Sequence, residues 1–530
     1  MGFTRDEGFY FRAAFQYLGW LKILGEGLVS LDLGEAFSQA AIDKHMGYNQ
    51  EHPVLPKLLF AGSYWLFHET LGWLRPSDAM RLPGILSAGL LTYLVYTFTT
   101  EAYGRAAAVV ACVALAAMPR PFFHAHLACF DAMMVTMWFF CMVAWWRGLR
   151  STGWAWGVGV VFGLALSVKH NAFFLPALFL VHWAIVYARG TRLLRGDGGE
   201  LRLNLPNLPI AFVSLAVLGP VVWYILWPNH WFDTYGRIVW YFKFHLHHVH
   251  YFQYFFGENL YAPPFPVHFP FTLSAITLPP VTVLAGVLGA VVCAAGWWKS
   301  RGRRPADDRG TGWLVGLGLL IPILIIAIPS TPIFGGIKHW TPAMPFLAVL
   351  AGVGVVEAGR AAGNQLAALL RRPVALPVTV ALAALVLAPA VLSTAHSHPN
   401  GTAHYNVLVG GVRGAADLRA MRQFWGYAGG DAVEFVSERL DGRGSVFWQN
   451  TTHDAYRMYQ RDGRLPAGIG YGAMGRSEYG MIHHQMAFVP LEVELWRAYR
   501  TRNPEFVSHH DGVPVLRVYR NTTRPARKRR

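Results

Sequence analysis

Long runs of apolar residues alternate with short polar segments along most of this chain, and the alternation predicts its architecture. Apolar runs of about 18 residues or more are long enough to cross the roughly 30 Å hydrocarbon layer as helices. The pattern predicts ten membrane-spanning helices, at residues 80–99, 105–118, 127–146, 153–168, 172–189, 209–227, 274–297, 312–329, 341–358 and 374–392. Only 14% of the 530 residues are charged, against about 25% in soluble domains, which also favours a bilayer environment.

The two ends of the chain depart from this apolar pattern, and the tail is long enough to form a small core of its own. In the tail we expect strands at 444–449 and 513–520 and helices near 415–440 and 491–502. The predicted fold is a multi-spanning α-helical membrane protein with about ten transmembrane helices. Its parts are a first loop (1–79), a membrane module (80–392) and a small C-terminal α/β domain (393–530).

Basic residues are distributed unevenly between the predicted loops. One alternating set of loops holds fifteen Lys and Arg residues, and the other holds five. Because cytoplasmic loops are enriched in Lys and Arg, the basic set is predicted to be cytoplasmic. The outer side then receives residues 1–79, 228–273, 330–340 and 393–530. The net charge of +16 is therefore interpreted as an orientation signal in a bacterial-type inner (plasma) membrane, and nucleic acid is not an expected partner.

Ionisable residues gather at the outer edges of the predicted spans. Such residues cost several kcal/mol at membrane depth and therefore tend to mark functional sites. The candidate site residues are Asp6, Glu7, His52, Lys57, Arg120, Asp131, Lys169, Lys338 and His339. Two structural alternatives stay open: Asp131 and Lys169 could form an ion pair between helices, and Asp6-Glu7 could be a solvated pair in a loop.

These residue types favour group transfer from a phosphorylated carrier. A carboxylate can take the proton from an acceptor hydroxyl as general base. A cation such as Lys57, Arg120, Lys169 or Lys338 can stabilise the phosphate of the leaving carrier. Because this chemistry needs no metal in principle, neither a cofactor nor a divalent metal is expected. The rival is a zinc site in the His-rich run 245–250, which lacks a separate set of Cys or carboxylate ligands and has aromatic neighbours typical of a membrane interface.

Two motifs resemble a known family. The run Asp6-Glu7-Gly8-Phe9-Tyr10, followed by His52-Pro53-Val54-Leu55-Pro56-Lys57, is similar to the first outer loop of membrane glycosyltransferases with the GT-C fold. The family in question includes the protein O-mannosyltransferases and the lipid A aminoarabinose transferases. Further similar stretches are residues 81–83, 123–131, 163–176, 335–345 and 405–411. Val54 departs from the family pattern, which usually has a second proline there.

The resemblance implies transfer of a hexose or pentose from a polyprenyl-phosphate donor to a protein, lipid or glycan acceptor at the outer membrane face. It assigns Asp6 as catalytic base and Glu7 as its neighbour in substrate binding. Asp131 is implied to be a second site carboxylate and Lys169 a phosphate contact. His52 and Lys57 are implied to shape the donor side.

Other interpretations remain possible on the sequence alone. A transporter or flippase of lipid-linked sugars is the alternative function, and it predicts internal repeats and broken helices with charges at the membrane midplane. A membrane-anchored binding protein that uses the tail 393–530 would leave Asp131 and Lys169 without a task. The family also has a transmembrane helix ahead of its Asp-Glu pair, so we expect a further apolar helix upstream of Met1.

Overall fold

The computed structural model covers the chain and describes residues 1–187, 192–195, 201–204, 208–247, 249–299 and 309–524. Four basic residues that contributed to the orientation prediction lie outside the described residues, namely Arg189, Arg301, Arg303 and Arg304. One histidine of the rival metal run, His248, also lies outside them.

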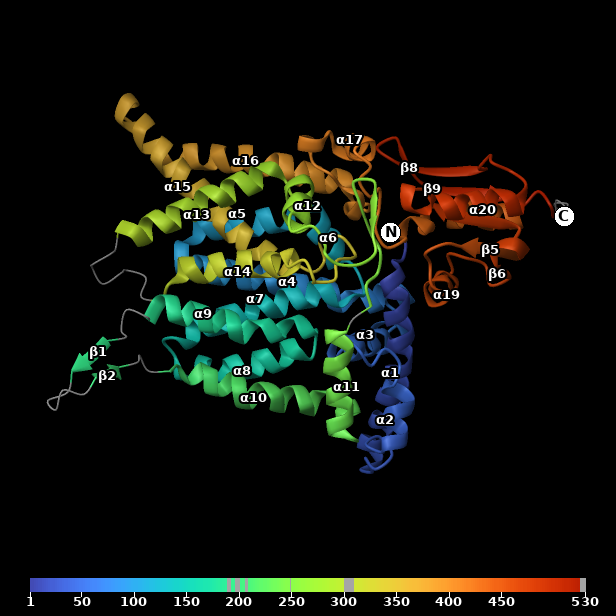
Figure 1. Cartoon of the computed structure of the whole chain (residues 1–530), viewed down its shortest axis with the longest axis horizontal. Helices are drawn as coiled ribbons and strands as arrows, with labels where there is room; N and C mark the ends of the chain where they lie inside the picture. Colours follow the sequence, from blue (N-terminus) through green and yellow to red (C-terminus); the bar gives the residue numbers. More distant parts are fainter. Residues whose placement is uncertain (188–191, 196–200, 205–207, 248, 300–308, 525–530) are drawn as a thin grey trace.

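A bundle of helices, most of them roughly parallel to one another, forms the body of the molecule (Figure 1). Its helices are α4 (Pro76–Tyr103), α5 (Arg105–Ala116), α6 (Pro119–Ala125), α7 (Phe130–Gly148), α8 (Thr152–Leu166), α9 (Leu175–Tyr187), α10 (Ile210–Leu226), α12 (Phe269–Thr277), α13 (Pro280–Lys299), α14 (Thr311–Ala327), α15 (Met344–Leu370) and α16 (Ala375–Ser397). Each predicted span overlaps at least one of them, and the span at 274–297 covers the end of α12 as well as most of α13. The multi-spanning helical membrane fold predicted from the apolar pattern is thereby confirmed.

The helices differ in whether they are long enough to cross a membrane. Among the described residues, five helices are long and apolar enough to span, or six if α5 and α6 are one span bent by 77°. The predicted span at 105–118 ends early because Pro119 begins a new helix after the bend. Helices α8, α10 and α14 are apolar but shorter.

Helix α15 is the central helix of the bundle and is buried along most of its apolar length. Small residues let its neighbours approach closely, as is common between membrane helices. A Cβ atom on Gly354 would lie 2.1 Å from the backbone oxygen of Ala285 on α13. Glycine at this position is therefore required by the close packing of the two backbones.

Four helices lie across one end of the bundle, roughly perpendicular to its long axis (Figure 1). They are α1 (Arg5–Ser30), α2 (Gln39–Met46), α3 (Leu55–Tyr64) and α11 (Thr234–Leu246). Helix α1 begins with a capping box, in which the Glu7 backbone N–H donates to the Thr4 hydroxyl and the Thr4 backbone N–H donates to the Glu7 carboxylate. This cap fixes where the helix that carries Asp6 begins.

The C-terminal part of the chain lies beyond these transverse helices (Figure 1). Its elements are α17 (Gly411–Asp417), α18 (Val433–Leu440), β5 (Gly444–Trp448), α19 (His453–Arg461), β6 (Ile469–Tyr471), β7 (Tyr479–His483), α20 (Val489–Tyr499), β8 (Phe506–His510) and β9 (Val513–Arg520). The strands form a mixed sheet in the order β6-β5-β7-β9-β8, in which β5 is parallel to β6 and β7, and β9 is antiparallel to β7 and β8. The predicted small α/β domain is confirmed.

The opposite end of the bundle collects loops that the charge pattern assigned to the cytoplasm. Glu101 near the end of α4 accepts ion pairs from Arg147 on α7, at 3.2 Å, and from Arg309 just before α14, at 3.5 Å. The short strands β1 (Arg192–Arg195) and β2 (Leu201–Asn204) extend from this same end (Figure 1). The basic set of loops and the transverse helices therefore occupy opposite ends of the bundle.

Replacing Gly354 with alanine is expected to lower the melting temperature of the purified protein in detergent. The added methyl group must push α15 away from α13, and overpacking of this kind typically costs about 1–3 kcal/mol. Gly157→Ala on α8 is the matched control because its Cβ would meet no atom within 4 Å, so the gain in helix propensity should leave stability equal or higher. Equal melting temperatures for the two variants would contradict the close α13–α15 packing.

Candidate active site

A large cavity of about 920 Å³ opens where the bundle, the transverse helices and the C-terminal domain meet. Its walls combine aromatic and aliphatic side chains with ionisable ones. Six of the nine candidate site residues line it: Asp6, His52, Asp131, Lys169, Lys338 and His339. These residues lie far apart in the sequence, and the fold brings them together around one space.

Asp6 and Lys338 form an ion pair at the edge of the cavity. The Lys338 ammonium donates to Asp6 Oδ2 at 3.1 Å, and the Asp6 side chain remains 23% exposed. Lys338 also lies over the Trp425 ring at 4.7 Å and over the Phe334 ring at 4.8 Å. Burial alone would lower the pKa of Lys338, but the carboxylates of Asp6 and Asp131 outweigh it and raise that pKa, so the side chain stays charged.

Asp131 and Lys169 form a second, more deeply buried pair, with 2.7 Å between Lys169 Nζ and Asp131 Oδ1. Asp131 lies in the first turn of α7, and Lys169 precedes the 3₁₀ helix η2 (His170–Phe174) that leads into α9. The pair therefore links α7 to the segment that leads into α9. This is the ion pair between helices that the sequence left open as a structural alternative. Because both side chains also line the cavity, the pair holds two opposite charges beside a potential substrate.

Lys57 lies behind the cavity wall and is not among the lining residues. Its ammonium donates to the backbone oxygens of Asn49, at 2.7 Å, and His52, at 2.8 Å, and lies over the ring of Tyr17. Burial lowers the pKa of Lys57 to about 7. The contacts fix the loop that presents Asn49 and His52 to the cavity.

Arg120 is likewise buried outside the lining. Its guanidinium donates to the backbone oxygen of His404 and lies between the rings of Tyr405 and Phe424. Phe424 itself lines the cavity. Arg120 thus positions a segment of the C-terminal domain against the bundle.

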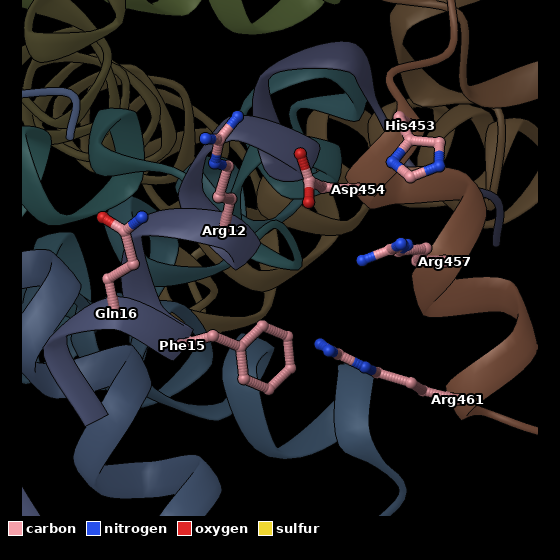
Figure 2. Close-up of a pocket in the computed structure, with 7 residues that line it drawn as sticks. All are labelled: Arg12, Phe15, Gln16, His453, Asp454, Arg457 and Arg461. Carbon is pink, nitrogen blue, oxygen red and sulfur yellow. The ribbon is translucent and has the colours of Figure 1, made fainter. Parts of the chain in front are cut away.

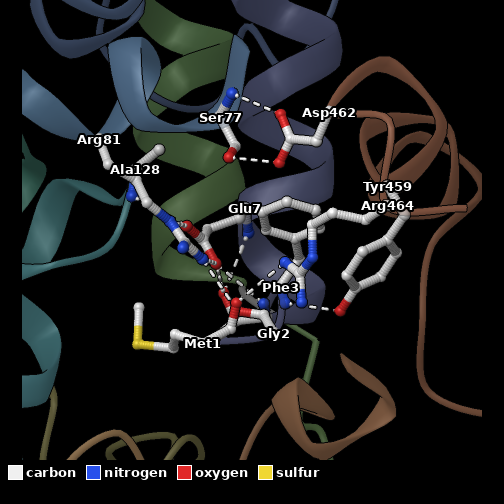
Figure 3. A network of polar contacts seen from close by, with 11 residues as sticks. Met1, Gly2, Phe3, Glu7, Ser77, Arg81, Ala128, Tyr459, Asp462 and Arg464 are labelled. Carbon is white, nitrogen blue, oxygen red and sulfur yellow. Dashed lines mark hydrogen bonds and ion pairs between the residues drawn. The ribbon is translucent and has the colours of Figure 1, made fainter. Parts of the chain in front are cut away.

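Glu7 is fully buried and also lies outside the lining (Figure 3). Its carboxylate accepts from Arg81 Nε at 2.7 Å and Nη2 at 3.0 Å, and from the backbone N–H of Ala128 at 3.1 Å. Arg81 also donates to the backbone oxygen of Gly2, at 2.9 Å. The contacts of Glu7 tie the start of α1 to α4 and to the turn before α7.

The same network reaches the C-terminal domain (Figure 3). The Phe3 backbone N–H donates to the Tyr459 hydroxyl at 2.8 Å, and Arg464 donates to the backbone oxygen of Met1 at 3.1 Å. Ser77, at the start of α4, donates to Asp462 through both its backbone N–H and its hydroxyl. The beginning of the chain is thereby held between the bundle and the C-terminal domain.

The structure adds cavity residues that sequence reasoning did not select. Arg5 lines the cavity and forms no ion pair with any carboxylate that the structure describes. Gln423 and Gln485, from the C-terminal domain, also line it; both are buried, with Gln423 Nε2 and Gln485 Oε1 lacking a hydrogen-bond partner within the described part of the chain. Unpaired buried amides are costly, so they mark places for a ligand. No spacing in the sequence signals these two glutamines, because they come from separate loops.

The His-rich run contributes His245 to the cavity, where its ring stacks on His170 with 4.1 Å between centroids. Within the described ranges, no group of three His, Cys, Asp or Glu side chains is placed to hold a metal ion. The expected absence of a cofactor stays a prediction.

Comparisons with known proteins agree with this architecture. Residues 51–224 match the model of the family described as dolichyl-phosphate-mannose-protein mannosyltransferase. A search of curated proteins gives no match. Among solved structures, apo ArnT from Cupriavidus metallidurans matches at 15% identity and a TM-score of 0.50, over 98% of this chain and 94% of that one.

Two further solved structures are similar at lower TM-scores. ArnT from Cupriavidus metallidurans bound to undecaprenyl phosphate matches at 15% identity and a TM-score of 0.48, over 88% of each chain. The apo oligosaccharyltransferase of Archaeoglobus fulgidus matches at 11% identity and a TM-score of 0.47, over 84% of this chain and 63% of that one.

The likeness to apo ArnT shows the fold, and this chain is an integral membrane protein with the GT-C fold. The family-model match over residues 51–224 then confirms the predicted resemblance to the membrane glycosyltransferases that include the protein O-mannosyltransferases.

Glu7→Gln is expected to destabilise the protein, because it leaves the Arg81 guanidinium buried without its countercharge. Breaking a buried pair in this way typically costs about 3–5 kcal/mol, which a lower melting temperature in detergent would report. Asp78→Asn, which breaks the exposed Arg75–Asp78 pair on the same helix as Arg81, is the control and should change stability by about 1 kcal/mol or less. The double variant Glu7→Gln/Arg81→Met should recover part of the loss. A Glu7→Gln protein with unchanged melting temperature but no activity would instead place Glu7 in the reaction.

Proposed function

We propose that this protein transfers a sugar from a polyprenyl-phosphate donor to an acceptor hydroxyl at the outer face of a membrane. Asp6 acts as general base on the acceptor hydroxyl. Lys338 holds the Asp6 carboxylate in place, and Lys169, Lys338 and Arg5 supply positive charge to the phosphate of the donor. The sugar bond to the carrier phosphate breaks as the new glycosidic bond forms, and the proton of the acceptor passes to Asp6.

The single observation that carries this proposal is the placement of Asp6. Of the two adjacent carboxylates, only Asp6 is partly exposed and lines the cavity. Its partner Lys338 donates to Oδ2, and Oδ1 has no hydrogen-bond donor among the residues that the structure describes. A carboxylate that is oriented by a cation and still reachable fits a base that must receive a proton. Glu7, being fully buried and paired, supports the start of α1 instead.

The apolar wall of the cavity suits the lipid part of such a donor. Phe173, Phe174, Phe242, Ile325 and Ile326 line one side, and they come from η2, α11 and α14. Phe174 is 42% exposed and Phe242 is 40% exposed, so this side opens toward the surrounding medium rather than into the protein core. An isoprenoid chain can lie against these side chains while its phosphate reaches the cationic end of the cavity.

The charge pattern supports an outward-facing cavity. Helices α1 and α11, which contribute residues to the cavity wall, lie at the bundle end opposite the loops with the most Lys and Arg (Figure 1). We assign those loops to the cytoplasm of a bacterial-type cell. The proposal includes no metal or other cofactor, since Lys and Arg side chains take the role of neutralising the phosphate. The family-model description, which names dolichyl-phosphate-mannose and protein, supports the donor class, while the sugar and the acceptor of this chain are left open as protein, lipid or glycan.

Asp6→Asn is expected to reduce transfer by about 10²–10⁴-fold, the usual contribution of a positioned general base. The measurement is glycosylated product formed by purified protein in lipid nanodiscs supplied with a polyprenyl-phosphate sugar and an acceptor-containing membrane extract. Asp32→Asn is the control, because Asp32 is an exposed carboxylate just after the same helix and should leave transfer unchanged.

Two outcomes would decide against the proposal. Near-normal product formation by a folded Asp6→Asn protein would remove Asp6 from the reaction. Movement of the donor lipid across the membrane of sealed vesicles, with no glycosylated product from wild-type protein, would favour a transporter or flippase. A melting temperature equal to that of the wild-type protein shows that the Asp6→Asn variant is folded.

A further inference from the structure

A second recess lies between α1 and α19, outside the cavity described above (Figure 2). Its volume is about 420 Å³. It is lined by Arg12, Phe15, Gln16, His453, Asp454, Arg457 and Arg461. Three arginines and one histidine thus accompany a single carboxylate in this cleft. Figure 2 shows Phe15 of α1 pointing toward α19, and Arg457 and Arg461 of α19 pointing toward α1 across the gap.

The three arginines of this cleft form no ion pair with a carboxylate among the residues that the structure describes. They are Arg12, Arg457 and Arg461. Like charges held close together repel, and the cost is offset when an anion binds between them. Burial is the main cause that lowers the pKa of Arg461, and the neighbouring Arg457 charge lowers it further, while Tyr64 and Asp454 act in the opposite direction.

Two of the arginines are oriented by aromatic rings. The Arg461 guanidinium lies 3.7 Å from the centroid of the Phe15 ring, and that of Arg12 lies 4.3 Å from the centroid of the Tyr48 ring. Stacking is the ordinary structural role of such arginines, and it occupies their faces. It leaves the N–H groups at their edges free to form the paired hydrogen bonds that arginine makes with phosphate. Arg457 is exposed and has no such stacking contact within the described chain.

The cleft is rigidly built, because α1 and α19 touch closely. A Cβ on Gly8 would lie 1.7 Å from the hydroxyl of Thr452, the residue that caps α19 by accepting from the Ala455 backbone N–H. The two helices therefore hold their arginines at a fixed separation. A preformed cationic cleft loses little entropy when it binds an anion.

The cleft also adjoins the cavity. Tyr48, beneath Arg12, lines the cavity, as does Phe9, which precedes Arg12 by one helix turn. Arg12 follows Asp6 by six residues, or about 9 Å along α1. A molecule that presents a hydroxyl to Asp6 can therefore extend into the cleft.

We propose that the cleft between α1 and α19 binds a phosphate-bearing group, distinct from the donor phosphate in the cavity. This group belongs either to the acceptor substrate or to a phospholipid of the outer leaflet. In the first case, which rests on the proposed function, the acceptor carries a phosphate in addition to the hydroxyl that receives the sugar. His453 and Gln16 add hydrogen-bonding groups around the arginines.

Binding of inorganic pyrophosphate to the full-length protein in nanodiscs of zwitterionic lipid tests this site without requiring transfer. The double variant Arg457→Gln/Arg461→Gln should bind pyrophosphate at least tenfold more weakly than the wild-type protein. Arg457→Gln alone should weaken binding about threefold or more, and Arg457 is exposed. Arg497→Gln, an exposed arginine on α20 of the same domain, is the control and should bind like the wild type.

Unchanged pyrophosphate affinity in both cleft variants, or an equal loss in Arg497→Gln, would overturn the proposal. Because Asp6→Asn should retain this binding, loss of transfer and loss of the cleft are separable results. Nanodiscs that contain phosphatidylglycerol identify the source of the group. If phosphatidylglycerol weakens pyrophosphate binding to the wild-type protein but not to the double variant, the cleft binds a phospholipid headgroup. If phosphatidylglycerol leaves pyrophosphate binding unchanged, the cleft is assigned to the acceptor.

Discussion

The buried ion pair between Glu7 and Arg81 is the interaction on which the site depends. It joins the first turn of α1 to the membrane helix α4, with 2.7 Å between Glu7 Oε1 and Arg81 Nε. Both charges are removed from water, so the pair is stable only because further donors satisfy the carboxylate. The backbone N–H groups of Thr4 and Ala128 serve this purpose. As a result, Asp6, which precedes Glu7 in the sequence, is held in a fixed position at the end of the bundle.

The membrane imposes the second constraint, because charges inside a bilayer must be paired or must face a polar space. The bundle satisfies it by placing its ionisable side chains at its two ends. One end has the Glu101 pairs with Arg147 and Arg309, which join helix termini. The other has the pairs Asp6–Lys338 and Lys169–Asp131, which surround a cavity. Ion pairs therefore connect helix termini at one end of the bundle and surround the candidate site at the other.

The helical fold could be predicted from the sequence because the apolar runs needed for membrane crossing are long and frequent. The bend between α5 and α6 was less visible, since hydropathy continues across it while Pro119 restarts the helix. Among candidate residues, those at the edges of spans, such as Asp131 and Lys169, could be selected because charges there are costly. Lys57 and Arg120 are also charged residues at the edges of spans, but they bind backbone oxygens behind the cavity wall. Only the direction of the side chain distinguishes a residue that lines the cavity from one that supports its wall.

The neighbouring carboxylates Asp6 and Glu7 show why sequence alone could not divide their roles. Successive residues on a helix point about 100° apart, so two adjacent acids can have different surroundings. Once the capping box commits Glu7 to the Thr4 backbone and to Arg81, the geometry of α1 turns Asp6 toward the cavity and Lys338. Phe9, which follows Asp6 by about one helix turn, also lines the cavity. The structural role of one acid thus determines the exposure of the other, and the pair combines a buried anchor with an accessible carboxylate.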